Sequence, residues 1–420
     1  MQKIIIKGGK KLKGKVKISG SKNAVLPILA ATILTENECI LNNVPQLKDV
    51  DTFVQLLATL GAKVSKKRKN QLSVDPSKIN NPEAPYDLVK TMRASFLVLG
   101  PLLARLGKAK VSLPGGCAIG ARPINLHLKG FELMGAKIKI HEGYVIAKAK
   151  KITGAKIYFD QPTVTGTENI MLAAVLAKGV TLIENASREP EVLNLVKVLI
   201  KMGARISGAG TDIIKIIGVA RLKGFDETVI PDRIETGTFM IAAALTGGEV
   251  EIQNCIPEHV EALFVKLQAA GSEIVIKNHS LFVKGRFPIK PVNIITAPYP
   301  GFPTDMQAQF MVLMALGNGV STISEKVFEN RYMHVAELRR AGADITIDGH
   351  TAMVKGVKEF LGAPMMATDL RASASLILAG LAAKGITTIS RIYHLDRGYE
   401  RIEEKFSALG ASIKRVTDKI

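Results

Sequence analysis

Apolar positions along the chain follow two alternating patterns, and each pattern predicts a different kind of element. One has helical spacing, as at Phe53, Leu56 and Leu60, and it ends at a Gly-Ala pair. The other is a β-branched run that follows such a pair, as at 345–347, and it predicts a strand. A glycine between the two segments is typical of a helix C-terminal cap.

This sequence of helix, glycine and strand recurs six times, which indicates internal repeats. The marker glycines are separated by 74, 68, 68, 71 and 68 residues, and they are Gly61, Gly135, Gly203, Gly271, Gly342 and Gly410. Upstream of the marker lies an Ala/Leu-rich helix followed by a short strand, as in 173–183, 242–252 and 378–389. Each unit is therefore predicted to be helix, strand, helix and strand, with further short strands, over about 70 residues.

The length of 420 residues favours two domains, because a single core rarely grows this large. Six repeats divide into two groups of three near residue 229. We therefore predict an α/β protein in which residues 22–229 hold the first three repeats and residues 1–21 and 230–420 hold the last three. The apolar strand at 4–6 precedes the first repeat and is a candidate member of the last one.

The composition is that of a globular protein, with 47% hydrophobic and 22% charged residues. The three cysteines, Cys39, Cys117 and Cys255, give no disulfide framework, and no ligand spacing predicts a metal site. Residues 1–14 alternate Ile with Lys and Gly, so we expect no signal peptide. No apolar run predicts membrane insertion, and a reducing cytoplasm fits the cysteine usage.

The formal net charge of +20 could indicate a nucleic-acid partner. However, the chain has no Trp and only 5% aromatic residues, which argues against stacking surfaces for single strands. The basic runs at 66–69 and 148–151 are expected in loops between repeats, where we interpret them as solvated lysine surface. We therefore expect no nucleic-acid partner, while the positive field favours an anionic small substrate.

The first helix of each repeat is predicted to begin at a polar segment about 40 residues before its marker glycine. These segments are 21–24, 91–94, 163–168, 231–233, 303–305 and 367–371. Helix N-termini attract anions, and Ser21, Thr304 and Thr368 there are explained as N-caps.

Four cations at these helix starts are not explained by capping, because a positive charge opposes the helix dipole there. They are Lys22, Arg93, Arg233 and Arg371. A bound anion, or a carboxylate such as Asp369, would resolve the conflict. We interpret these positions as functional.

The segment 113–123 places Cys117 among three glycines and five residues before Arg122. Glycines let a backbone move and approach a ligand closely. A nearby cation stabilises a thiolate and can hold an anion. The local residues fit a reactive thiol on a mobile loop and an ordinary buried cysteine equally well.

Eight long motifs, in order, give the chain a close resemblance to the UDP-N-acetylglucosamine enolpyruvyl transferases over essentially its whole length. The motifs are Ser-Lys-Asn at 21–23, Thr-Met-Arg-Ala-Ser at 91–95, Pro-Gly-Gly-Cys-Ala-Ile-Gly-Ala-Arg-Pro at 114–123, Glu-Asn-Ala-Ser-Arg-Glu-Pro-Glu at 184–191, Pro-Asp-Arg-Ile-Glu-Thr-Gly-Thr at 231–238, Phe-Pro-Thr-Asp-Met-Gln-Ala-Gln at 302–309, Ala-Thr-Asp-Leu-Arg-Ala at 367–372 and Asp-Arg-Gly-Tyr-Glu-Arg at 396–401.

The resemblance implies two inside-out α/β barrel domains of three repeats each, which close on substrate in the cleft between them. It also implies a reaction in which phosphoenolpyruvate is joined to the 3′-hydroxyl of UDP-N-acetylglucosamine and phosphate is released, by addition and then elimination. In the family this reaction opens peptidoglycan synthesis, requires no metal or other cofactor, and is inhibited by fosfomycin.

The resemblance also assigns roles at the reacting centre. Cys117 is the implied general acid and the residue alkylated by fosfomycin, and Asp305 is the implied base. Lys22, Arg122 and Arg397 would clamp the phosphate and carboxylate groups, because cationic side chains suit oxyanions. Asn23 would donate a hydrogen bond to the reacting centre.

Further positions match the nucleotide-sugar contacts of the family. They are Lys22, Asn23, Arg93, Arg122, Pro123, Ile124, Asn125, Leu126, Gln161, Pro162, Thr163, Val164, Asp305 and Val327. Residues that would support these contacts or domain closure are Glu189, Asp232, Arg331, Asp369 and Arg371. Lys48, Asp49 and His394 fit either a site role or surface charge and a satisfied loop histidine.

Three positions depart from the common family pattern, namely Asn125, Gln161 and Thr165. All three fall in the nucleotide-sugar segments, so they bear on individual uridine contacts and leave the reaction unchanged.

Three other functions fit these residues less well. An enolpyruvyl transferase acting on shikimate 3-phosphate shares the repeats, but the Pro-Gly-Gly-Cys loop argues against it. A cysteine hydrolase would use His127 or His141 as base, yet no oxyanion-binding signature accompanies them. A basic scaffold for nucleic acid would spread its cations over one face, whereas the arginines here fall at repeat-equivalent helix starts.

Overall fold

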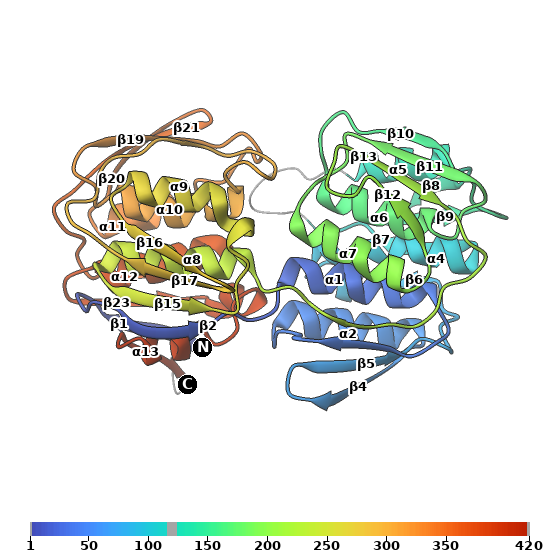
Figure 1. The fold of residues 1–420 in the computed structure, drawn as a ribbon, viewed down its shortest axis with the longest axis horizontal. Helices are drawn as coiled ribbons and strands as arrows, with labels where there is room; N and C mark the ends of the chain where they lie inside the picture. The colour runs from blue at the N-terminus through green and yellow to red at the C-terminus, as the bar shows by residue number, and fades with distance from the viewer. Residues whose placement is uncertain (1, 116–123, 418–420) are drawn as a thin grey trace. The chain divides into compact units, whose positions relative to one another are not determined.

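The chain folds into two compact units (Figure 1). In this computed structural model, residues 2–115 and 124–417 are described. The central unit comprises the described residues of 20–230, and the terminal unit comprises those of 2–19 and 231–417. The terminal unit is therefore built from both ends of the chain.

The central unit contains the first three repeats. The first comprises α1 (Lys22–Ala31), η1 (Thr32–Leu34), β3 (Cys39–Asn42), α2 (Lys48–Leu60), β4 (Lys63–Arg68) and β5 (Gln71–Asp75). The second comprises β6 (Glu83–Ala84), α3 (Tyr86–Val89), η2 (Arg93–Val98), α4 (Leu99–Leu106), β7 (Lys108–Ser112), α5 (Asn125–Leu133), β8 (Lys137–His141) and β9 (Tyr144–Lys148). The third comprises β10 (Lys156–Tyr158), α6 (Val164–Ala174), β11 (Val180–Glu184), α7 (Pro190–Lys201), β12 (Arg205–Ser207) and β13 (Ile213–Ile217), after which β14 (Asp226–Thr228) returns to the first sheet.

The terminal unit contains the other three repeats. The fourth comprises β2 (Lys13–Lys17), α8 (Arg233–Thr246), β15 (Glu249–Gln253), η3 (Pro257–Val260), α9 (Glu261–Ala269), β16 (Glu273–Lys277) and β17 (Ser280–Lys284). The fifth comprises β18 (Ile294–Ile295), η4 (Thr304–Met306), α10 (Gln307–Met314), β19 (Val320–Ser324), α11 (His334–Arg340), β20 (Asp344–Asp348) and β21 (Thr351–Lys355). The sixth comprises β22 (Pro364–Met366), α12 (Leu370–Ala382), β23 (Ile386–Ser390), η5 (Ile392–Arg397), α13 (Ile402–Ala408), β24 (Ser412–Thr417) and β1 (Gln2–Lys7).

Every repeat builds the same sheet. Within the described residues there are six four-stranded sheets, three in each unit, with orders such as β10-β11-β13-β12 and β18-β19-β21-β20. In each sheet one edge strand pairs in parallel with the strand after the first helix, and an antiparallel pair completes the other side, which is a hairpin in five sheets and the pair of β1 and β24 in the sixth. The parallel pairing requires a crossover, and in the second, third, fifth and sixth repeats it contains the buried first helix of the repeat.

The first helices of the repeats form the interior of each unit, and the sheets lie outside them (Figure 1). Every residue of α8 from Ile234 to Thr246 is buried, as is every residue of α12 from Arg371 to Leu381. A helix that is apolar on all sides must be surrounded by protein. The alternating sheets supply that cover, which confirms the predicted inside-out α/β fold class.

The six marker glycines all adopt the left-handed backbone conformation. Their φ values are 111° at Gly61, 89° at Gly135, 105° at Gly203, 103° at Gly271, 95° at Gly342 and 93° at Gly410. Only glycine enters this region without a steric cost from Cβ. Their interpretation as the ends of the second helices is confirmed.

Strand β1 lies between β23 and β24 in the last sheet, antiparallel to both. The predicted participation of residues 4–6 in the sixth repeat is therefore confirmed. In the same way, β2 supplies the parallel edge strand of the fourth sheet beside β15.

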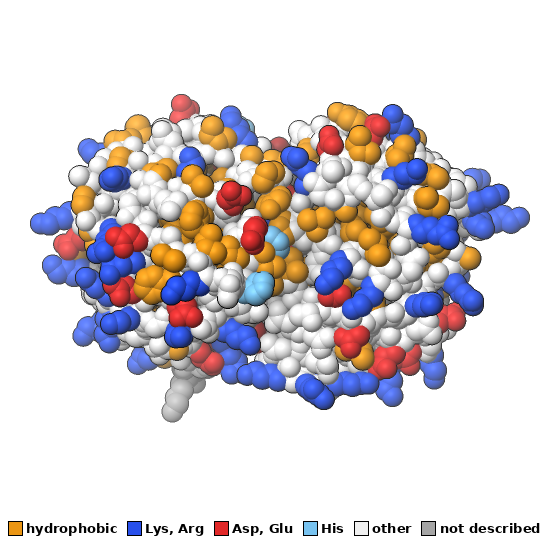
Figure 2. All heavy atoms as spheres, viewed as in Figure 1, with side chains coloured by type: hydrophobic (Ala, Val, Ile, Leu, Met, Phe, Trp, Pro, Cys, Tyr) orange, Lys and Arg blue, Asp and Glu red, His pale blue; other side chains and the backbone are white. Residues whose placement is uncertain are grey.

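The basic runs do not lie only in loops between repeats, as the sequence had suggested. Residues 66–68 belong to β4, and Lys148 ends β9, so only 149–151 form a linker. The runs are exposed, and Lys and Arg side chains project from both units in the space-filling view (Figure 2). Among the described residues, no helix is both long and apolar enough to cross a membrane.

Candidate active site

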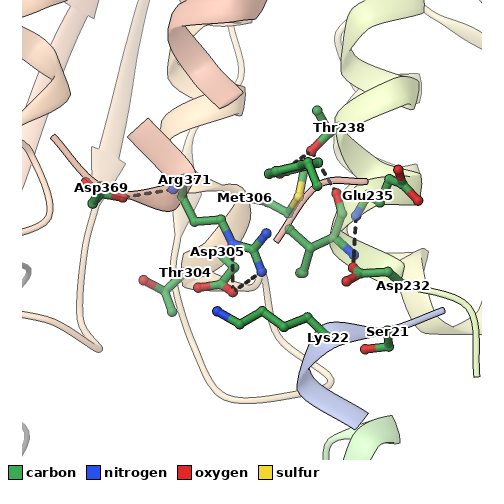
Figure 3. Close-up of polar contacts among 12 residues, drawn as sticks. Ser21, Lys22, Asp232, Glu235, Thr238, Thr304, Asp305, Met306, Asp369 and Arg371 are labelled. Carbon is green, nitrogen blue, oxygen red and sulfur yellow. Dashed lines mark hydrogen bonds and ion pairs between the residues drawn. The ribbon is translucent and has the colours of Figure 1, made fainter. Parts of the chain in front are cut away.

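Asp305 in the terminal unit is held between two arginines. Arg371 donates from Nε and Nη2 to Asp305 Oδ2 at 3.0 and 2.8 Å, and Arg331 Nη2 donates to Oδ1 at 2.6 Å. The three side chains come from η4, from the first turn of α12 and from the loop before α11. Figure 3 shows the carboxylate of Asp305 and the guanidinium of Arg371 pointing toward each other.

The charges of this cluster fix the protonation state of Asp305. Burial alone would raise its pKa, but the positive charges of Arg371 and Arg331 hold the pKa well below the usual range. Conversely, the carboxylate outweighs the effect of burial on Arg371 and raises the pKa of that guanidinium. Asp305 is therefore a carboxylate at neutral pH. Its negative charge balances that of Arg371, which explains why an arginine is tolerated at the start of α12.

Thr304 does not cap a helix, contrary to the expectation from sequence. Its hydroxyl donates to Glu325 Oε2 at 2.8 Å and accepts from Arg331 Nη1 at 2.9 Å. Glu325 is fully buried, and its Oε1 accepts from the backbone N–H groups of Val327 and Phe328 at 2.8 and 3.1 Å. Glu325 thus fixes the backbone at Val327, a role that sequence reasoning missed.

The N-cap of α12 is Asp369 and not Thr368. Asp369 Oδ1 accepts from the backbone N–H groups of Arg371 and Ala372 at 2.8 and 3.0 Å. Asp232 caps α8 in the same way, at 2.7 and 3.0 Å from the N–H groups of Ile234 and Glu235 (Figure 3). A carboxylate at this position satisfies free N–H groups and complements the helix dipole.

The aromatic ring of Tyr399 packs beneath the arginine of this cluster. The Arg371 guanidinium carbon lies 5.5 Å from the Tyr399 ring centre, which is within the range of a cation–π contact. Arg371 Nη1 is buried and has no hydrogen-bond partner among the described residues. Arg397 ends η5, two residues before Tyr399, and His394 lies in the same turn with a pKa lowered by burial and by the charge of Arg397.

In the central unit, Lys22 is the first residue of α1 and pairs with Asp49 at the start of α2. The Lys22 Nζ lies 2.7 Å from Asp49 Oδ2, and the two side chains are only 12% and 4% exposed. Ser21 is the N-cap, as predicted, and accepts from the N–H of Ala24 at 3.3 Å. Asp49 is therefore a structural partner of Lys22, whereas Lys48 beside it is exposed. Asn23 is the half-buried second residue of α1.

His127 in the first turn of α5 is buried near Arg93, which begins η2. Its Nε2 lies 3.4 Å from Thr165 Oγ1 and its Nδ1 lies 3.2 Å from Asn169 Nδ2. Burial, together with the charge of Arg93, lowers the pKa of His127 to about 4. A neutral, packed imidazole is ill suited to serve as the base of a hydrolase, and it instead links α5 to the start of α6.

The described nucleotide-sugar positions of this unit lie at the starts of α5 and α6. Ile124 precedes α5, Asn125 is exposed and Leu126 is half-buried. Thr163 is the N-cap of α6 and accepts from the N–H of Gly166 at 3.2 Å, with Val164 as the first helical residue and Gln161 and Pro162 exposed before it. Cys117, Arg122 and Pro123 lie outside the described residues.

Glu189 is buried at the start of α7, close to other buried acids. It accepts a hydrogen bond from the hydroxyl of Ser187. Burial, and then the charges of Glu191 and Glu189, raise the pKa of Glu168 well above its usual value. Among the described residues, no cluster of three or more potential ligand side chains could hold a metal ion.

The family model of EPSP synthase (3-phosphoshikimate 1-carboxyvinyltransferase) matches residues 6–406. The chain belongs to the enolpyruvyl transferase family. It is 62% identical over 418 residues to a UDP-N-acetylglucosamine 1-carboxyvinyltransferase of Geotalea uraniireducens, with 100% of both chains covered. A protein of the same name from Myxococcus xanthus is 58% identical, with 99% of both chains covered.

Solved structures share the architecture of this enolpyruvyl transferase chain. The enolpyruvyl transferase NikO from Streptomyces tendae superimposes with a TM-score of 0.89 at 26% identity, covering 100% of this chain and 99% of that one. An EPSP synthase from Acinetobacter baumannii superimposes with a TM-score of 0.78 at 19% identity, covering 99% and 100%. At that identity the second match shows the fold alone.

Proposed function

We propose that this transferase joins the enolpyruvyl group of phosphoenolpyruvate to the 3′-hydroxyl of UDP-N-acetylglucosamine and releases phosphate. The observation that carries the proposal is the 62% identity, over the full length of both chains, to a relative named for this activity. The cations at the starts of repeat-equivalent helices support it, because both substrates are anionic.

The addition step needs an acid and a base. Cys117 would donate the thiol proton to the methylene carbon of phosphoenolpyruvate while the 3′-oxygen forms a bond to the neighbouring carbon. Asp305 would receive the hydroxyl proton. The product is a tetrahedral intermediate that still carries the phosphate group.

The elimination step restores the double bond. The Cys117 thiolate would take back a proton from the new methyl group, the electron pair of that C–H bond would form the double bond, and the C–O bond to phosphate would break, with the proton held by Asp305 passing to the departing phosphate. Lys22, Arg122 and Arg397 would hold the phosphate and carboxylate groups throughout. Asn23 would donate a hydrogen bond to the reacting centre.

The pairing of Asp305 refines its role. A carboxylate held by two arginines is always ionised at neutral pH, but its lowered pKa makes it a weak base. We therefore assign Asp305 first to orienting the 3′-hydroxyl by accepting its hydrogen bond. It takes the proton only as the forming C–O bond makes that hydroxyl strongly acidic.

The nucleotide sugar would lie against Arg93, 122–126, 161–164 and Val327. Glu325 holds the backbone at Val327. The contact between His127 and Thr165 links α5 to α6, the two helices that begin at the segments 122–126 and 161–164. The candidate residues are divided between the two units, with Lys22 and Arg93 in the central unit and Asp305 and Arg397 in the terminal unit. Glu189, Asp232, Asp369 and Arg331 would support these contacts.

The wider role follows from the reaction. The product would commit UDP-N-acetylglucosamine to peptidoglycan synthesis in the cytoplasm, and through the cell wall it would serve cell shape and division. Fosfomycin would inhibit the enzyme by alkylating Cys117. No metal or organic cofactor enters any step.

Phosphate release from phosphoenolpyruvate tests this proposal directly. Phosphate should appear with UDP-N-acetylglucosamine and remain at background with shikimate 3-phosphate. Release with shikimate 3-phosphate alone would assign the chain to the other branch of the family. Release with neither acceptor would refute the proposed function.

A further inference from the structure

The central unit contains a hollow that the proposed reaction does not use. It has a volume of about 950 Å³. It is lined by the ends of η1 and α4 with the residues after them (34–37 and 103–107), by 176–179 after α6, and by the linkers 149–152 and 218–222. The candidate substrate residues Lys22 and Thr163 lie at the opposite ends of the helices α1 and α6. The hollow is therefore a separate site.

The lining of the hollow is strongly basic. Lys150, Lys151, Lys178 and Arg221 are exposed, and they come from two linkers and from the segment after α6. In the described part of the chain, these four side chains form no ion pair with a carboxylate. Glu36 is the one acidic residue in the lining, and its carboxylate lies 3.9 Å from Arg105.

These cations are not needed to cap the helices that end here. Basic side chains often satisfy the last carbonyl groups of a helix. Here Arg105 already donates to the carbonyls of Ile33, Thr35 and Pro76 at 3.0, 2.8 and 3.0 Å. The carbonyl of Val175 accepts from the backbone N–H of Val219 at 2.9 Å. The four exposed cations are therefore available for a ligand.

A second observation comes from the sheet beside the hollow. Lys108, Lys148 and Lys137 stand directly opposite one another on three neighbouring strands. Like charges in such a cross-strand row destabilise a sheet. Lys108 follows Gly107 and Lys148 precedes Ala149, and both of these neighbours line the hollow. Lys108 and Lys148 of this row therefore adjoin the rim of the hollow, and in the described part of the chain none of the three lysines forms an ion pair with a carboxylate.

We propose that this hollow binds a small ligand that carries several phosphate groups. Its volume falls within the range of about 300–1,000 Å³ that is usual for small-molecule sites. The cations come from three separate segments and line one hollow, which suits a compact polyanion better than the flat surface of a membrane. The row of lysines at the rim would gain a counter-charge when the ligand binds.

Calorimetric titration of the full-length protein with inorganic tripolyphosphate tests the proposal. The variant K150E/K151E/K178E should bind at least tenfold more weakly than the wild type. The milder variant K150M/K151M/K178M should also bind more weakly, by a smaller factor. A matched control, K63E/K66E/K69E on the exposed hairpin of β4, carries the same change of charge and should bind like the wild type.

Any binding of the probe at the substrate residues would be equal in all four proteins, so the differences report on the hollow. Unaltered phosphate release and circular dichroism would show that each variant is folded. Equal affinity in all proteins, or an equal loss in the control, would overturn the proposal. It would also fail if the lysine changes abolished binding to phosphatidylglycerol vesicles while tripolyphosphate binding was unchanged.

Discussion

The ammonium group of Lys22 lies 2.7 Å from the carboxylate of Asp49, and both side chains are almost fully enclosed. Lys22 begins a helix, where its positive charge is unfavourable next to the dipole. Asp49 compensates for that charge from the start of the neighbouring helix α2. The pair therefore presents an ordered cation at a helix start without requiring a ligand to stabilise it.

Asp49→Asn should lower the free energy of unfolding by more than an exposed Asp→Asn change on the same helix. Loss of the carboxylate removes the negative charge that faces the buried ammonium, and breaking a buried ion pair in this way typically costs about 3–5 kcal/mol. Urea denaturation at neutral pH measures this loss. Asp51→Asn, an exposed change on the same helix, should alter the free energy of unfolding by less than about 0.5 kcal/mol. Equal effects of the two changes would show that the ion pair contributes nothing.

Asp305→Asn should reduce kcat by about 10²–10⁴ because the 3′-hydroxyl loses its acceptor and base. The same change should lower the free energy of unfolding, because Arg331 and Arg371 lose their shared carboxylate. Steady-state phosphate release and urea denaturation measure the two effects separately. Asp344→Asn, at the exposed start of β20, provides the control. Normal turnover in the Asp305 variant would exclude the catalytic assignment.

Fosfomycin should alkylate Cys117 alone among the three cysteines. Burial raises the pKa of the Cys39 thiol to about 12 and that of the Cys255 thiol to about 11, so neither forms a reactive thiolate at neutral pH. Peptide mass mapping after incubation identifies the modified residue. An adduct on Cys39 or Cys255 with Cys117 unmodified would contradict the assignment.

Cys117→Asp separates the acid role from the reaction with the drug. A carboxylic acid can still donate a proton, but it attacks an epoxide poorly. This variant should therefore retain some turnover and resist fosfomycin. Cys117→Ser serves as the control and should lose most of its activity, because a hydroxyl is a much weaker acid than a thiol. An inactive Asp variant would leave the acid role of Cys117 without support.

The stability of the central unit should depend on pH through His127. The unfolded chain takes up the imidazole proton near pH 6.5, whereas the folded protein takes it up only at about pH 4. Protons therefore favour the unfolded state in this window. The contribution of His127 is lost as the pH falls from 6.5 to 4, at up to about 1.4 kcal/mol per pH unit.

His127→Gln should flatten this part of the stability profile. His334, whose pKa burial also lowers to about 4, is present in both proteins and cancels in the difference. Urea denaturation at pH 7.5 and pH 5 gives the difference. His141→Gln, on the exposed strand β8, should leave the slope unchanged. If the His127 and His141 variants have equal slopes, the buried imidazole does not titrate as described.

The repeat architecture was predictable because its signals are local. A glycine such as Gly61 or Gly203 must adopt positive φ at the end of a helix, and the apolar spacing before it is visible in one window of sequence. The place of strand β1 was also predictable. Its apolar segment lies before the first repeat and belongs to none of the first five, so the sixth repeat is where it can complete a sheet.

The partners of the site residues were less predictable, because they come from distant segments. Thr304 is a residue type that often caps helices, yet its hydroxyl donates to Glu325, 21 residues later in the chain. No local sequence pattern predicts that contact. Arg371 was expected near Asp369, whereas its guanidinium pairs with Asp305, 66 residues earlier in the chain. Such contacts depend on how the repeats pack, so the family resemblance named Arg371 as a supporting residue without predicting its carboxylate partner, and it did not name Glu325.

Because β1 and β2 join sheets whose other strands come from beyond residue 230, the two units must mature in a fixed order during synthesis. The ribosome completes residues 20–230 first, and the central unit can fold while the remaining chain is still being made. The segments of β1 and β2 meanwhile lack their partner strands, because β15, β23 and β24 are synthesised later. Translation errors or truncation near the C-terminus would therefore expose aggregation-prone strands at the opposite end of the chain.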